Sequence, residues 1–111
     1  MTVQQAAQKL GLSVLSGGEA LGREIECVYC CDLLSFVMGR APADSAWVTV
    51  MGNVNAMAVA LLADVACVVL AEGAQFDDEA KQKAEQNDIA VLASPRPVYD
   101  TAKEIDRELH P

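Results

Sequence analysis

The four cysteines carry the most reactive side chains in this chain. Cys27 and Cys30 form a C-x-x-C pair, Cys31 follows directly, and Cys67 lies further along. Four thiolates could bind zinc or an iron–sulfur cluster, and a neighbouring pair could act as a redox switch. Strand geometry sends Cys27 and Cys31 to one face and Cys30 to the other, and Cys67 lies in an apolar stretch. The pattern therefore favours reduced cysteines packed as small hydrophobic side chains, with a metal or redox protein as an alternative.

The sequence contains no convincing catalytic set. The only histidine, His110, is the penultimate residue. Ser35 follows Asp32 at a short spacing, but no histidine is placed to activate its hydroxyl, which excludes a Ser-His-Asp or Cys-His nucleophile. Asp32 is instead predicted to cap the helix that follows it. We expect a protein that is not an enzyme and that uses no cofactor.

Polar residues follow each predicted buried strand, and they form the candidate ligand site. The candidates are Gly52, Asn53, Asn55, Glu72, Gly73, Arg96, Asp32 and Ser35. In open α/β sheets ligands bind outside the carboxyl ends of the strands, which is where these residues are expected. Free N–H groups after Gly52 suit a phosphate or carboxylate, Glu72 suits a cation or a ribose hydroxyl, and Arg96 is the cation placed to meet an anion. Simple turn chemistry explains the same residues, because Gly52 can take backbone angles closed to other residues and Asn53 or Asn55 can cap the following helix. Neither a Rossmann fingerprint nor a P-loop lysine is present.

The elements that must position these residues follow from hydrophobic periodicity. Helices are predicted over residues 3–10, 32–38, 54–62 and 77–87 and after Pro97, and strands over 13–15, 23–29, 47–51, 67–70 and 89–92. The first helix has a capping box from Thr2 to Gln5 and a stop at Gly11. The last three strands are apolar throughout, as expected for strands covered on both faces.

The predicted fold class is therefore α/β. We expect a two-layer or three-layer sandwich with a mostly parallel sheet of about five strands, flanked by helices, in a single domain over residues 1–111. The N-terminal region looks like a hairpin, which would add antiparallel strands and make the sheet mixed.

Composition limits the classes of partner. A formal charge of −8 and a pI near 4.4 argue against nucleic-acid binding, because an acidic surface repels phosphate backbones. No apolar run is long enough to span a bilayer and the N-terminal residues do not resemble a signal peptide, so we expect no membrane association and a cytoplasmic location. A hydrophobic content of 52% in so short a chain predicts a homodimer that buries surplus apolar surface.

The order of the motifs resembles the DRTGG domain family. The resemblance rests on Leu15–Glu19, Cys31–Ser35, Trp47–Val50 with Asn53–Asn55, Ala71–Gly73 and Tyr99–Thr101, and it covers nearly the whole chain. The family often has Gly-Asp-Arg where this chain has Gly52-Asn53-Val54, and Thr-Gly-Gly where it has Ala71-Glu72-Gly73. The chain therefore lacks the Asp and Arg of the name-giving pattern.

The resemblance implies an α/β domain similar to the N-terminal domain of bacterial HPr kinase/phosphorylase. Such domains occur alone or fused to CBS domains in regulators and some pyrophosphatases, and they are regarded as regulatory or dimer-forming modules. We therefore expect a non-catalytic regulatory and dimerisation module that senses a small anionic metabolite or nucleotide. The alternatives are an interaction scaffold for a regulatory protein partner without a small ligand, and the cysteine-based metal or redox protein.

Overall fold

The computed structural model describes all residues, 1–111, and contains five α-helices, one 3-10 helix and five strands. The elements in chain order are α1 (Val3–Leu10), β1 (Ser13–Ser16), η1 (Gly18–Gly22), β2 (Cys27–Cys30), α2 (Leu34–Arg40), β3 (Ser45–Thr49), α3 (Val54–Ala63), β4 (Cys67–Leu70), α4 (Asp78–Gln86), β5 (Val91–Ala93) and α5 (Val98–Leu109). None of the helices combines the length and apolarity that a membrane-spanning segment needs.

The strands form one mixed sheet in the order β1-β5-β4-β3-β2. β2, β3, β4 and β5 run parallel, and β1 pairs antiparallel with β5 at one edge. The prediction that the N-terminal region makes the sheet mixed is confirmed by β1, but the hairpin is wrong, because β1 and β2 lie at opposite edges of the sheet. Residues 23–25 instead pair with the start of the chain, where Val3 N–H donates to the Arg23 carbonyl and Ile25 N–H donates to the Met1 carbonyl. This pairing explains why the second strand is confined to residues 27–30 rather than the predicted 23–29.

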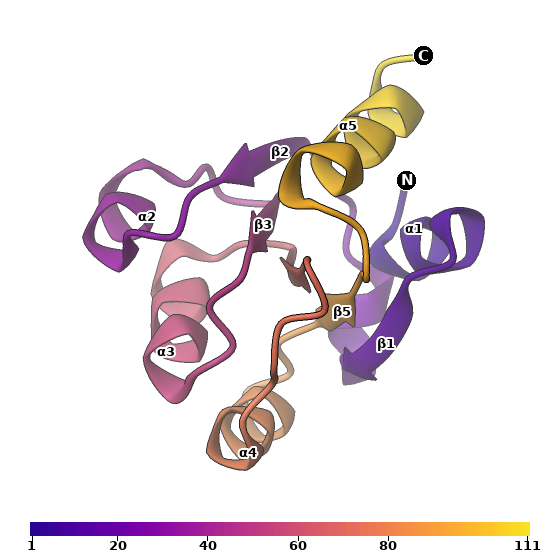
Figure 1. Cartoon of the computed structure of the whole chain (residues 1–111). Coiled ribbons are helices and arrows are strands. Elements are labelled where there is room, and N and C mark those ends of the chain that lie inside the picture. The colour runs from indigo at the N-terminus through magenta and orange to yellow at the C-terminus, as the bar shows by residue number, and fades with distance from the viewer.

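Helices cover both faces of the sheet, which gives three layers (Figure 1). Alternate strand residues supply the two cores. Val48 and Val69 pack with α1 and α5, whereas Trp47, Val68 and Leu70 pack with α2, α3 and α4. Every residue of β3 and β4 is buried, which confirms the prediction for β4 and for Trp47–Thr49. Val50, which the predicted strand included, is exposed.

Several predicted local signals are confirmed. Thr2 and Gln5 form the capping box of α1, and Gly11 ends this helix in the left-handed conformation with φ 67°. Asn53 caps α3, since its side chain accepts a hydrogen bond from Ala56 N–H. The predicted strand 47–51 is shifted to 45–49, because Val50 N–H leaves the sheet and donates to the Asp32 side chain.

Candidate functional site

The carboxyl ends of β2 and β3 are joined by the Asp32 side chain. Its Oδ1 accepts hydrogen bonds from Thr49 Oγ1 at 2.7 Å and from Val50 N–H at 3.1 Å. Thr49 is fully buried, so this carboxylate provides its hydroxyl with a partner. The prediction that Asp32 caps the next helix is wrong, because Leu33 holds the N-cap position of α2 without a side-chain cap bond. Ser35 lies one residue into α2 and is exposed.

The turn after β3 is held by close backbone packing at Gly52. A Cβ atom on Gly52 would lie 1.9 Å from the carbonyl oxygen of Gln75, and Gly52 O accepts a hydrogen bond from Asp77 N–H. Unusual backbone angles are not what requires this glycine, because its φ is not in the left-handed region. Space, rather than conformation, therefore requires glycine. The turn rests against the loop that follows β4, with Asn53 as helix cap and Asn55 exposed in the first turn of α3.

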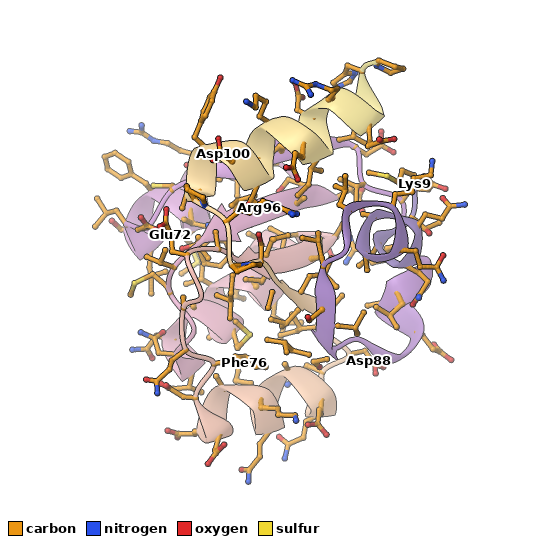
Figure 2. The ribbon with its side chains drawn as sticks, turned by 45° about the vertical axis from the view of Figure 1, so that its right-hand side comes forward. Lys9, Glu72, Phe76, Asp88, Arg96 and Asp100 are labelled. Carbon is orange, nitrogen blue, oxygen red and sulfur yellow. The ribbon has the colours of Figure 1, made fainter.

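The loop after β4 leads to α4 and contacts the start of α5 on the way. Glu72 and Gly73 both adopt left-handed conformations, with φ of 60° and 66°. Glu72 Oε2 accepts a hydrogen bond from Val98 N–H at 2.8 Å, at the start of α5 (Figure 2). The Pro97 N-cap makes no side-chain cap bond of its own, so Glu72 satisfies this end of the helix from a distant segment.

Removing this cap gives a direct test of the structural role of Glu72. Glu72→Ala is expected to lower the free energy of unfolding by about 1 kcal/mol, the usual cost of losing a helix N-cap. Thermal or urea unfolding measures the loss, and Glu72→Gln is the control because it keeps an acceptor oxygen. Equal losses in both variants, or none in either, would contradict the assigned contact.

Arg96 follows β5 at the predicted edge, but its side chain turns away from it. Its Nη2 donates to the Leu10 carbonyl at 2.9 Å and lies 3.0 Å from Glu104 Oε2. Figure 2 shows this side chain running beneath α5 towards α1. The guanidinium therefore connects α1 with α5, and the expectation that it faces an anion at the sheet edge is not met by this geometry.

An open pocket of about 510 Å³ lies at this edge, between β1, β5 and the loop after β4. Its lining residues are Ser13, Leu15, Gly73, Ala74, Phe76, Ala93, Ser94 and Pro95. This volume is in the range of small-molecule sites, and the walls are mainly apolar with two hydroxyl groups. Ser94 Oγ is already within 2.9 Å of Thr101 Oγ1 and accepts from Arg96 N–H. No charged side chain lines the pocket, so it suits an uncharged ring better than a bare phosphate.

A second pocket, near the amino ends of the strands, holds only about 50 Å³. Arg23 on its wall is bonded to both Asp44 and Asp64. Burial lowers the pKa of Arg23, but the bonds to these two carboxylates outweigh it, and the net pKa lies above its ordinary value. The volume is too small for a metabolite, and the cation is already paired.

The cysteines do not gather into a metal site. Nowhere do three or more cysteine, histidine or acidic side chains lie together in a way that could hold a metal ion. Cys67 is fully buried in β4, whereas Cys30 is exposed on β2. Desolvation and the nearby charges of Asp32 and Cys31 raise the pKa of the Cys30 thiol, which leaves less of the reactive thiolate.

The structure divides the predicted site into three neighbouring parts. Asp32 and Ser35 lie at the ends of β2 and β3, Gly52 and its asparagines start α3, and only Gly73 of the predicted set lines the large pocket. The other lining residues of this pocket, Phe76 and Leu15 in particular, were not predicted from the sequence. No local signal could have revealed them, because they meet only through the β1–β5 pairing and the loop before α4.

The fold and this edge define an α/β domain with an open pocket beside the carboxyl ends of β4 and β5. The family model described as "DRTGG domain" matches residues 5–108, and the chain belongs to the DRTGG domain family. The resemblance seen in the sequence is therefore confirmed. Comparison with curated proteins finds no match.

A solved structure shares the fold. It is the crystal structure of the CBS and DRTGG domains of the regulatory region of Clostridium perfringens pyrophosphatase, complexed with its activator diadenosine tetraphosphate. The TM-score is 0.75 at 13% sequence identity, over 97% of this chain and 47% of the other. This chain thus spans about half the length of that regulatory region.

Proposed function

We propose that this chain is a non-catalytic regulatory domain that binds a small metabolite in the pocket between β1, β5 and the loop after β4. The observation that carries the proposal is the pocket itself, since apolar walls with a few polar groups are typical of ligand sites at the carboxyl edge of parallel strands. The DRTGG domain of the pyrophosphatase belongs to a regulatory region that binds a nucleotide activator, which supports a regulatory role of the same kind.

The ligand class that we propose is a nucleotide whose base enters the pocket beside Phe76 and Pro95. Aromatic and proline side chains offer flat surfaces to a planar ring. The phosphates would remain outside, near the loop that contacts both the pocket and the Gly52 turn. There the N–H groups of Val54 and Asn55 have no partner within α3, and Asn53 already serves Ala56. Because the domain is acidic, a divalent cation would help a phosphate to approach.

A thermal-shift screen tests this function. The probes are AMP, ATP, diadenosine polyphosphates, cyclic dinucleotides and common phosphometabolites, each with and without Mg²⁺. A true ligand at about 100 times its dissociation constant is expected to stabilise the fold by roughly 2.7 kcal/mol, a shift of many degrees for a domain of about 100 residues.

Three variants locate the binding site in the same assay. Ser13→Tyr is expected to abolish the shift, because it places a large side chain at the pocket from an exposed position on an edge strand. Val14→Tyr is the matched control, since the next residue of a strand points to the other face and Val14 does not line the pocket. Loss of the shift in Asn53→Ala alone would move the site to the Gly52 turn. Absence of any shift with every probe would contradict ligand binding.

Self-association is the second function that we propose, and it needs no small ligand. Large apolar side chains stay exposed on and directly before α2 and on α3, including Leu33, Phe36 and Leu62. Such clusters mark surfaces that contact another protein. Sedimentation of the purified chain tests this candidate, and a monomer at tens of micromolar would contradict it.

A further inference from the structure

α3 is a surface helix without a polar side. Val54–Ala63 contains no charged residue, and its core side buries Ala56, Met57 and Val59. Its outward side carries Leu61 and Leu62, which are 44% and 71% exposed. A helix at the surface of a monomer normally presents polar residues to water on this side.

The neighbouring helix extends the apolar surface. α2 packs beside α3 on the same side of the sheet (Figure 1), and it exposes Phe36 and Met38 at 42% and 49%. Leu33, directly before α2, is 55% exposed. The α2–α3 face is defined by the exposed residues Leu33, Phe36, Met38 and Leu62, and Leu61 lies at its border on the wall of the small pocket.

This face is also almost free of charge, although the chain carries −8. From residue 32 to residue 64 the sequence has four charged residues, Asp32, Arg40, Asp44 and Asp64, and each has a partner within the chain. Asp44 and Asp64 are paired with Arg23, and Asp32 accepts hydrogen bonds from Thr49 and Val50. The Arg40 guanidinium lies 4.0 Å from the centre of the Phe36 ring. The α4 and α5 surfaces, by contrast, carry acids such as Asp78, Glu79 and Asp106.

We propose that the α2–α3 face is the contact surface for a second copy of this chain, arranged about a two-fold axis. This inference rests on the self-association proposed above and names its face. Two acidic domains repel each other where unpaired carboxylates meet, so contact is favoured on a surface whose few carboxylates, here Asp32 and Asp64 at its borders, already have partners. A basic partner would be drawn to α4 or α5, whereas an uncharged apolar face is complementary to itself, as a two-fold contact requires. The i, i+4 row Val54, Ala58 and Leu62 offers a ridge for helix-on-helix packing.

Sedimentation equilibrium of paired variants tests the face. The wild-type chain of 11.8 kDa is expected to sediment as a dimer of twice that mass at tens of micromolar. Leu62→Asp is expected to weaken the dimer by about 100-fold or more, because it buries an unpaired carboxylate from each copy. Tyr99→Asp is the matched control, since Tyr99 is also 71% exposed but lies on α5, on the other side of the sheet. It is expected to leave the dimer unchanged.

The results of this experiment distinguish a wrong choice of face from an absence of self-association. A wild-type chain that is monomeric would overturn both. A wild-type dimer that tolerates Leu62→Asp, or that Tyr99→Asp dissociates instead, would overturn only the α2–α3 face. Leu62→Arg is a second variant with the opposite charge, and it is expected to dissociate the dimer as Leu62→Asp does. Far-ultraviolet circular dichroism of each variant confirms that the monomers are folded.

Discussion

Gly52→Ala is expected to destabilise the domain by about 3 kcal/mol, the upper part of the range for overpacked sites. The added methyl group would lie 1.9 Å from the Gln75 carbonyl oxygen and 3.2 Å from the Phe76 Cα. Both atoms belong to backbone, so no side chain can rotate to make room. Either the turn after β3 or the loop before α4 must move, and the hydrogen bond from Asp77 N–H to Gly52 O would be strained. Thermal unfolding is expected to show a midpoint more than about 10 °C lower.

Gly39→Ala is the control for this prediction and has the opposite expected sign. Gly39 lies within α2, and an added Cβ there meets no atom within 4 Å. Alanine is expected to raise the stability by up to about 1 kcal/mol, the difference in helix propensity between the two residues. Similar unfolding midpoints for Gly52→Ala and Gly39→Ala would contradict the close packing at Gly52.

The same contact bears on the departure from the family pattern. Where the family often has Gly-Asp-Arg, this chain keeps the glycine and has Asn53 and Val54 in place of the charged residues. Asparagine and aspartate are both good N-caps, and Asn53 caps α3 through Ala56 N–H. The loss of the acid therefore keeps the architecture of the turn, whereas the loss of the arginine removes a cation from the start of α3. A phosphate approaching this turn would depend on backbone N–H groups.

Sequence patterns predicted the elements well where the signal was local. The capping box at Thr2 and Gln5, the stop at Gly11 and the Asn53 cap each need only a few neighbouring residues. The buried strands were also predictable, because continuous apolar runs indicate burial on both faces. The fold class followed from their alternation with helices.

Contacts between residues that are far apart in the sequence could not be predicted from local patterns. Asp32 has the residue type and spacing of a helix cap, yet its oxygen binds Thr49 on the neighbouring strand. The Arg96 guanidinium donates to the Leu10 carbonyl, 86 residues away, so it lies between α1 and α5 and does not face the sheet edge. For both residues the neighbouring sequence predicted a plausible role. In the structure each side chain instead bonds to a group that is far away in the sequence.

The acidic residues and the exposed apolar residues lie on different surfaces of the domain. The acids of α4 and α5 keep those surfaces solvated, while the α2–α3 face has few charges to keep it in water. The large pocket, by contrast, lies beside β1 and β5, at the opposite end of the sheet from β2. The proposed dimer face and the proposed ligand pocket therefore lie on different surfaces, and a dimer formed through the α2–α3 face would leave the pocket accessible in each copy.

Cys67 is expected to make the stability of the folded domain depend strongly on pH. Burial raises the pKa of the Cys67 thiol from 9.0 to about 12, although the charge of Arg23 lowers it slightly. In the unfolded chain this thiol ionises near its ordinary pKa, whereas the folded domain keeps the proton until about 12. The folded state therefore binds more protons above pH 9, and its stability must fall as the pH rises through this window. The expected loss is about 1.4 kcal/mol per pH unit.

Urea unfolding under reducing conditions between pH 8 and about 11 measures this slope, with Cys67→Ala as the reference protein. Alanine leaves a small cavity and lowers the stability at every pH, but it carries no titrating group at this position. Other titrating residues affect both proteins alike, so the difference between their slopes belongs to Cys67. Parallel curves would contradict the buried, protonated thiol. A steeper curve for the wild-type chain would show a cysteine that is held by the core as a neutral hydrophobic side chain, and a thiol in that state is neither a metal ligand nor a redox group.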